Sequence, residues 1–408
     1  MSKIKHAAAW VVPMMALVGY ATHARAEDHM VLVDTIDVGG NGLATFDISF
    51  VDPKLDLYIL ADRTNGSIDF FDASDDTFSS RVGGFAGQKF KADGVTADNT
   101  ISGPDGVVIV NDSEVWAGDG DSTVKVIDIA SHAIVDTIKT NGKFRCDEMA
   151  WDSADHILAV ANNADTPPFV TMINTDTHVV IGQIVFDGTN GTPDATLTGI
   201  EQPQWSPKTG LFYVAVPQIT PSDPTEGGVS VIDPSSMSVT ATYPVLNCAP
   251  AGLALGRRHE AMVGCSASFV VPPATVATTQ SVVINLDNGD IVANITQAGG
   301  NDMVGYDPGT AHYYLAARNT LTAGKVTPIL GTVDAKTNTW DSGVATSTTA
   351  HSVAADKVSR HVFVPIGMVP STAPAGTDST NPCPTRGCIA VYLPSSIDDD
   401  DGTRQARR

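Results

Sequence analysis

Acidic residues recur along the chain at nearly regular intervals, each at the start of a short apolar run. The members of this series are Asp47, Asp105, Asp147, Glu201 and Asp302, with Ala251 and His351 at the two remaining positions. Successive members are separated by 42 to 58 residues. If the apolar runs lie side by side, the five carboxyl groups converge on one place. Several carboxylates cannot all stay ionised there unless some pKa values rise or a cation neutralises them.

A cation site is the chemistry that this convergence favours. Carboxylate oxygens are the ligands that Ca²⁺, Mg²⁺ and Mn²⁺ prefer, so Asp47, Asp147, Glu201 and Asp302 are the predicted metal ligands. A metal in this position can polarise a carbonyl group or activate a water molecule. We therefore predict Asp147, Glu201 and His351 as catalytic residues, with His351 acting as a base or as a further ligand.

Polar side chains that follow the second apolar run of each repeat should face the same place. Arg63 and Arg318 could bind a substrate carboxylate through two parallel hydrogen bonds, and Asn163 and Gln218 suit a metal or a carbonyl group. These four are the predicted substrate-binding residues. A structural role is the alternative, in which the aspartates accept backbone N–H groups of the adjacent repeat and the arginines only pair with the carboxylates. The sequence leaves both interpretations open.

The elements that must position these residues are short strands. One strand pattern, an apolar run closed by an acidic or polar turn, recurs seven times along the chain. The seven copies span residues 67–74, 123–130, 169–176, 228–235, 281–288, 329–336 and 388–395. Three further β-type runs accompany most copies, bounded by Gly, Asn, Asp and Pro. A repeat of about 50 residues with four strands is typical of a β-propeller blade.

The two ends of the chain predict how the ring closes. The last copy of the repeat has no fourth strand after it, whereas residues 30–38 form an unpaired run of the fourth-strand type before the first copy. The N-terminal strand can therefore complete the last blade, which removes an open sheet edge. We predict an all-β fold: one seven-bladed β-propeller domain over residues 27–396. A sandwich or two smaller domains is the alternative.

The termini outside the repeats have compositions of their own. Lys3 and Lys5 precede an apolar run over 7–20, and Ala24-Arg25-Ala26 follows, so residues 1–26 are predicted to be a secretory signal peptide. Residues 397–408 are predicted to be a disordered tail with acidic and basic parts. The expected location is therefore periplasmic or secreted. The net charge of −22 argues against binding to nucleic acid, and no later stretch predicts membrane insertion.

Five cysteines in an exported chain suggest disulfides with one thiol left over. Cys248 and Cys265 lie at the ends of successive strands that meet in a hairpin, and Cys383 and Cys388 could close a small loop. Cys146 then remains unpaired. A buried inert thiol is the simpler interpretation for it; a reactive thiol is the alternative, because a basic residue precedes it.

The strand patterns resemble those of a known family. Residues 123–128 with 135–138, and 229–233 with 239–243, carry the "V-x-V-I-D" and "K-V-V-x-T-I" strands of the YVTN-type seven-bladed propellers. The resemblance covers about residues 30–395 and implies the propeller fold and export. It implies no single activity, because such propellers include enzyme subunits and haem carriers. This chain differs in placing acidic residues where the family has a Pro-x-Gly approach. A similarity to the calcium-dependent lactonases of the gluconolactonase type is one of architecture.

The sequence lacks the motifs of several common enzyme and cofactor classes. The sequence has no HExxH, no CxxCH, no Gly-x-Ser-x-Gly and no phosphate loop, which argues against zinc proteases, covalent haem, common serine hydrolases and nucleotide cofactors. The function that we predict is metal-assisted hydrolysis of a small ester or lactone-like ligand, with Ca²⁺ or another divalent metal. A non-catalytic ligand- or protein-binding propeller is one alternative. A redox propeller that binds a cofactor non-covalently, with His351 as axial ligand, is another.

Overall fold

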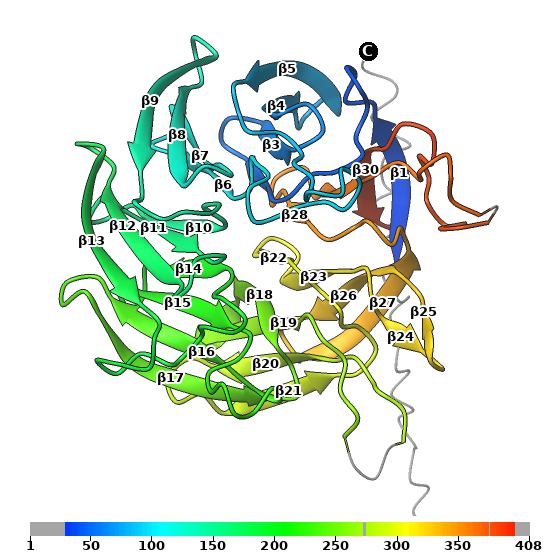
Figure 1. The fold of residues 1–408 in the computed structure, drawn as a ribbon. Coiled ribbons are helices and arrows are strands. Elements are labelled where there is room, and N and C mark those ends of the chain that lie inside the picture. The colour runs from blue at the N-terminus through cyan, green and yellow to red at the C-terminus, as the bar shows by residue number, and fades with distance from the viewer. Residues whose placement is uncertain (1–28, 272–274, 375, 396–408) are drawn as a thin grey trace, which may run out of the picture.

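The chain forms a ring of seven antiparallel sheets around a central channel (Figure 1). The structure is a computed structural model that describes residues 29–271, 275–374 and 376–395. The predicted signal peptide at 1–26 and the tail at 397–408 lie outside the described residues. Each sheet has four strands, and the sheets follow one another around the ring in chain order. The predicted seven-bladed β-propeller is confirmed.

The first four blades are built from consecutive strands. Blade 1 contains β2 (Ser49–Asp52), β3 (Leu57–Asp62), β4 (Ser67–Asp72) and β5 (Thr77–Gly83). Blade 2 contains β6 (Val107–Val110), β7 (Glu114–Gly118), β8 (Thr123–Asp128) and β9 (Ala133–Lys139). Blade 3 contains β10 (Met149–Asp152), β11 (Ile157–Asn162), β12 (Phe169–Asn174) and β13 (Val179–Val185). Blade 4 contains β14 (Pro203–Ser206), β15 (Leu211–Val216), β16 (Glu226–Asp233) and β17 (Ser238–Leu246).

The last three blades vary this plan. Blade 5 contains β18 (Pro250–Leu255), β19 (Glu260–Cys265), β20 (Ser281–Asn285) and β21 (Ile291–Ile295), with the 3-10 turn η1 (Arg257–His259) between its first two strands. Blade 6 contains β22 (Val304–Asp307), β23 (His312–Ala317), β26 (Ile329–Asp334) and β27 (Thr339–Ala345), and it carries the small hairpin β24 (Leu321–Thr322) and β25 (Lys325–Val326). Blade 7 contains β28 (Ala354–Ala355), β29 (Val362–Ile366), β30 (Cys388–Pro394) and β1 (Met30–Ile36).

The N-terminal strand closes the ring as predicted. β1 pairs antiparallel with β30, from Met30 opposite Pro394 to Ile36 opposite Ile389. Figure 1 shows blue β1 beside red β30, so the two ends of the propeller domain share one sheet. This pairing covers the backbone edge that an open ring would leave exposed.

Burial explains the order of the strands within a blade. Third strands such as β8 are buried along almost their whole length, because neighbouring blades pack on both of their faces. Fourth strands such as β9 alternate between exposed and buried positions, as expected of an outer strand. The recurring acidic turn closes the hairpin between them. For example, the Asp128 carboxylate accepts a hydrogen bond of 2.7 Å from the Ser131 backbone N–H.

Both expected disulfides are present, Cys248–Cys265 and Cys383–Cys388. They tie the first two strands of blade 5 together and close a small loop ahead of β30. Cys146 is a buried free thiol. Within the described residues, no helix is long and apolar enough to cross a membrane.

Candidate functional site

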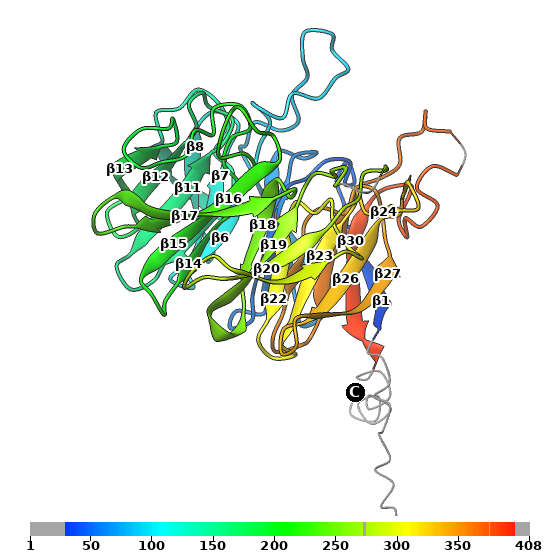
Figure 2. The ribbon, with the colours of Figure 1, turned by 90° about the horizontal axis from the view of Figure 1, so that it is seen from below.

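A polar cavity of about 430 Å³ lies at one mouth of the central channel, and we call it the upper cavity. Asp47, Asp147, Glu201 and Asp302 line it, each two residues ahead of the first strand of its blade, and three of them are held by the same backbone hydrogen bond. The backbone N–H of Asp47 donates to the carbonyl of a second-strand alanine at 2.9 Å, and those of Asp147 and Glu201 do so at 2.8 Å. Because this bond recurs, equivalent side chains point to one centre. The segment between β5 and β6, which projects in cyan from one face in Figure 2, also lines the cavity, through Gln88, Ala97 and Asn99.

One side of the upper cavity, which we call the arginine side, is a closed network of ion pairs. Arg63 is hydrogen-bonded to both Asp47 and Asp105, with its Nε atom 3.0 Å from Asp105 Oδ1. Arg145 contacts the same two carboxylates at 3.3 and 3.5 Å, and its Nη2 atom lies 2.6 Å from Asp147 Oδ2. Asn163 adds a hydrogen bond to Asp147. Two guanidinium groups therefore serve three carboxylates.

The charges of this network keep Asp47 ionised. Burial opposes ionisation, but Arg63, His351 and Arg145 outweigh it and hold the pKa of Asp47 well below its usual range. The Arg63 side chain is only 6% exposed. Since its donors are already used within the network, the arginine side needs no further cation.

The opposite side of the cavity, which we call the glutamate side, consists of Glu148 and Glu201 and borders on Asp147. One carboxylate oxygen from each of these three residues lies within 4.8 Å of the others. Glu148 is 3% exposed, and its buried Oε2 atom has no hydrogen-bond partner among the described residues. Neither glutamate forms an ion pair within the described part of the chain. A buried carboxylate without a partner is costly, so this place calls for protons or a cation.

The pKa values on the glutamate side shift upward. Burial is the largest cause for Glu148 and Glu201, and repulsion from Asp147 adds to it, so that both pKa values lie well above the usual range. Burial also raises the pKa of Asp147 to about 6, although Arg145 acts in the opposite direction. Proton binding and cation binding are therefore alternatives at the same oxygens.

His351 lies at the rim of the arginine side. Its ring stacks on Phe46 with centroids 4.4 Å apart and an interplanar angle of 8°. Its Nδ1 atom lies 2.7 Å from the Thr349 carbonyl oxygen and must donate a proton to it. The other ring nitrogen, Nε2, lies 3.6 Å from Asp47 Oδ1. This arrangement suits a base that Asp47 can stabilise once it is protonated.

The structure brings most of the predicted site residues together. Those that line the upper cavity are Asp47, Arg63, Asp147, Glu201, Asp302, Arg318 and His351. Asn163 lies behind Asp147, as its hydrogen bond to that residue shows. Gln218 is buried away from the cavity wall and donates to the Thr220 carbonyl at 2.7 Å.

The two predicted substrate-binding arginines differ in how many of their hydrogen-bond donors are already used by carboxylates of the protein. Arg63 is enclosed by two carboxylates, as described above. Arg318 is 33% exposed, and the ion pair that it forms is a single contact of 2.9 Å with Asp302. Arg318 therefore keeps donors for an anionic group in the cavity, whereas Arg63 does not.

Arg145 has no assigned role at the site in the sequence analysis, and Glu148 is expected to add polar lining only if the start of its strand is kinked. Arg145 precedes Cys146 in the loop that leads to Asp147, and a basic residue two places before an acidic series member was the available signal. Glu148 directly follows a series member, where strict alternation along a strand would turn it away from the channel. The Asp147 N–H donates to the Ala161 carbonyl and the Ala161 N–H donates to the Glu148 carbonyl, so two residues oppose one residue of β11 in a β-bulge, and the Glu148 side chain also lines the cavity.

Comparisons with known proteins support the fold and extend no further. No family model and no curated protein matches the sequence. Among solved structures, a chain of a mitotic checkpoint complex superimposes with a TM-score of 0.59 at 11% identity, covering 95% of this chain and 98% of that one. At this identity the likeness concerns the propeller architecture alone.

Proposed function

We propose that this protein is an exported, metal-dependent hydrolase of small esters or lactones that works in the upper cavity. The single observation that carries the proposal is the glutamate side: the buried Glu148 and the half-buried Glu201 converge there beside Asp147 and form no ion pair within the described residues, and the arginines of the adjoining network are already occupied. The resemblance to YVTN-type propellers and the signal-peptide pattern support the export part of the proposal.

The residues on the glutamate side fit a hard divalent cation. Asp147, Glu148 and Glu201 offer oxygen ligands, as Ca²⁺, Mg²⁺ and Mn²⁺ require, and Asp302 lies in the wall of the same cavity. This ligand set revises the sequence prediction, because Glu148 joins it and Asp47 is neutralised by arginines instead. A bound cation would supply Lewis acidity toward a carbonyl oxygen.

The protein's own residues account for the proton transfers. His351 Nε2 is placed to accept a proton from water while the water oxygen adds to the carbonyl carbon. The carbon–oxygen bond of the ester or lactone then breaks, and the same proton passes to the leaving oxygen, giving an acid and an alcohol. The free donors of Arg318 are suited to holding an anionic group of the substrate or product.

Titration of the purified mature protein with Ca²⁺ or Mn²⁺ tests the cation site. After treatment with chelator, we expect one equivalent to bind to the wild type, and binding at least tenfold weaker in Glu201→Gln. Asp155→Asn is the matched control, because it removes an exposed carboxylate from the turn between β10 and β11 of the adjoining blade. It should leave binding unchanged.

Hydrolysis of 4-nitrophenyl acetate and of simple lactones tests the activity. We expect turnover that requires the cation, is abolished by chelator and is strongly reduced in His351→Ala. Stoichiometric cation binding without any turnover would contradict the hydrolase and favour a ligand-binding propeller. Failure of every divalent cation to bind would refute the metal site itself.

A further inference from the structure

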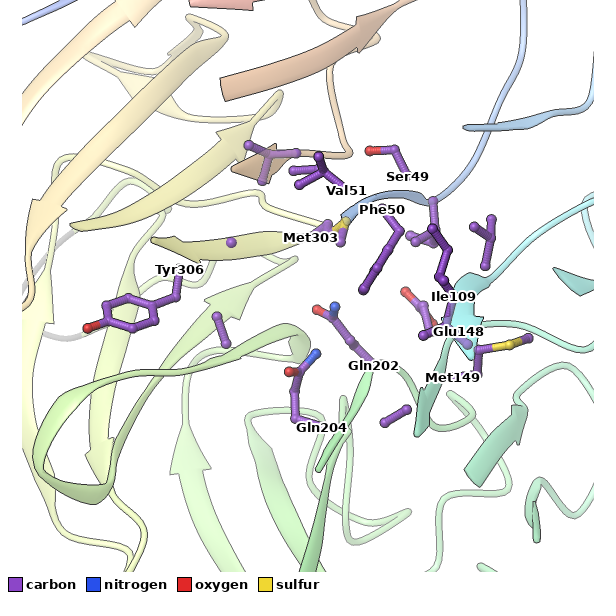
Figure 3. A pocket seen from close by; sticks show the side chains of 18 of the residues that line it. Ser49, Phe50, Val51, Ile109, Glu148, Met149, Gln202, Gln204, Met303 and Tyr306 are labelled. Carbon is purple, nitrogen blue, oxygen red and sulfur yellow. The ribbon is translucent and has the colours of Figure 1, made fainter. Parts of the chain in front are cut away.

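A second cavity, which we call the lower chamber, continues the central channel beyond the acidic cluster (Figure 3). Its volume is about 480 Å³, within the range of small-molecule pockets. The walls come from the first strands of all seven blades, namely β2, β6, β10, β14, β18, β22 and β28. Among the described residues, Glu148 alone lines both this chamber and the upper cavity. The glutamate side therefore forms the waist between two compartments.

The lower chamber differs from the upper cavity in chemistry. Most of the side chains that line it are apolar, including Phe50, Val51, Ile109 and Met303, which Figure 3 shows around the channel, although polar atoms contribute about half of its exposed surface. The upper cavity is instead lined mainly by charged and hydroxyl side chains. Apolar side chains of this kind favour contact with alkyl or aryl groups over hydroxyl groups.

The polar groups of the lower chamber gather at the waist and at its outer end. Glu148 and Gln202 extend into the channel in Figure 3. The Gln202 side-chain oxygen accepts the Leu253 backbone N–H at 2.8 Å, so this residue is fixed in place. Glu148 Oε2 has no partner. A molecule in the chamber would thus meet apolar side chains along its body, and at its inner end the unpartnered oxygen of Glu148.

We infer that the lower chamber binds the apolar alkyl or aryl group of a small molecule whose polar end meets Glu148. The identity of the bound group rests on the proposed function. In a hydrolase, the apolar group in the chamber would be the acyl chain of an ester or the ring substituent of a lactone. The substrate class is then an alkyl- or aryl-substituted ester or lactone rather than a polyhydroxylated sugar lactone.

Binding of n-alkanols from ethanol to octanol to the metal-free full-length mature protein tests the chamber without any need for catalysis. The fluorescence of Trp151 and Trp205, which both line the chamber, reports occupancy. Each added methylene should tighten binding by about threefold to fourfold until the chamber is full. An affinity that does not depend on chain length would overturn the inference.

A second test of the inference fills part of the lower chamber with a larger side chain. Gly305 lines the chamber, and a Cβ atom there would meet its nearest neighbours at an ordinary 3.6 Å, so that Gly305→Leu adds bulk without a clash at that atom. We expect it to weaken hexanol binding at least tenfold. Gly83→Leu makes the same change at an exposed position of outer strand β5 and should bind as the wild type does. Equal binding by both variants, with unchanged melting temperatures, would also overturn the inference.

Substrate preference separates this inference from the proposed function. In the presence of the cation, 4-nitrophenyl hexanoate should have a KM at least tenfold below that of the acetate, and Gly305→Leu should abolish the difference. Hydrolysis that is equal for both esters in every variant would refute the chamber's role while leaving the hydrolase intact. Chain-length-dependent alkanol binding without any ester turnover would refute the hydrolase and support the chamber as a ligand site.

Discussion

The arginine side and the glutamate side of the upper cavity draw on the same repeat, yet their surroundings differ. Asp47, Asp105 and Glu201 occupy equivalent positions, and Glu148 directly follows such a position. Asp47 and Asp105 are matched by Arg63 and Arg145. Glu148 and Glu201 have no cationic partner in the described part of the chain, and their pKa values are raised. The repeat thus supports an ion-paired network on one side and a cluster without ion pairs on the other. The pairing on the arginine side is incomplete, because Asp105 Oδ2 has no hydrogen-bond partner among the described residues and burial raises the pKa of Asp105.

This difference shows that the repeat determines the direction of a carboxylate side chain, whereas the loops determine whether an arginine lies beside it. Arg63 follows β3, and Arg145 precedes the first strand of blade 3. No arginine from a corresponding loop reaches Glu201 in the described structure. A buried ion network fixes the arrangement of the blades, whereas an unmatched cluster keeps a cost that a ligand can relieve. If this division is correct, substitutions on the two sides should change stability in opposite directions.

Arg63→Met should have the largest effect, because it leaves Asp47 and Asp105 buried with less compensation. Breaking a buried ion pair from one side costs about 3–5 kcal/mol, and we expect the free energy of unfolding in urea to fall by about that amount. Arg318→Met is the control, since its single ion pair is partly exposed and should contribute at most about 1 kcal/mol. Equal losses in the two variants would show that the arginine side has no special structural role.

Glu148→Gln should have the opposite sign. In chelator at neutral pH, the amide removes one of the mutually repelling groups and provides a donor for the remaining carboxylates. We expect the free energy of unfolding to rise by about 1–2 kcal/mol, because replacing a buried unpaired charge by a neutral group usually stabilises the folded protein. Urea denaturation measures the change. A variant that is less stable than the wild type in chelator would indicate that Glu148 belongs to a satisfied network.

The pH dependence of stability should reflect the raised pKa values of the cavity carboxyl groups, including that of Asp105 on the arginine side, which burial raises. A carboxyl group in the unfolded chain has a pKa of about 4, whereas burial raises that of folded Asp147 to about 6, and those of Glu148 and Glu201 are also raised. The folded protein then binds more protons than the unfolded chain, so its stability falls as the pH rises from about 4 through about 6. The lowered pKa of Asp47 acts the other way: its contribution is present above about pH 4 and is lost in stronger acid.

Melting temperatures between pH 4 and pH 8 in chelator check this prediction. The wild type should lose stability toward pH 8, and saturating Ca²⁺ should restore it, because the cation replaces the protons. The double variant Glu148→Gln/Glu201→Gln should show a flatter profile. If the double variant and the wild type had parallel profiles, the raised pKa values would not be the source of the pH dependence.

Much of the fold was predictable because it depends on local patterns that repeat. The seven third strands, the β1 closure and both disulfides follow from strand periodicity and hairpin geometry. The starts of the first strands were harder to predict. Ahead of β2, β10 and β14, two successive residues pair with one alanine of the second strand, and such a bulge breaks the strict alternation of side chains along a strand.

The candidate site was predictable in position but not in its division into two sides. The spacing of the series was enough to bring Asp147, Glu201 and Asp302 to one cavity. It could not show that Arg145 matches three carboxylates at once, because that match depends on side chains from several blades. Gln218 follows β15 much as Arg63 follows β3, yet its side chain donates a hydrogen bond to Thr220 in its own loop. Contacts between blades have no signature in a single repeat.

The smallest effect is expected at Cys146, which lies next to Arg145 and so tests whether the arginine side is closed. Its neighbour does not activate it: burial raises the pKa of the Cys146 thiol to about 12, and the side chain contacts Thr140 at 3.3 Å. The thiolate is the reactive form, so the native protein should show no reaction with iodoacetamide at pH 8 over hours. With both disulfides intact, one equivalent should react once guanidinium unfolds the chain. Arg63→Met should loosen the network and so allow slow labelling of the thiol. Rapid labelling of the native wild type would instead show that the arginine side opens readily and is not the rigid half of the cavity.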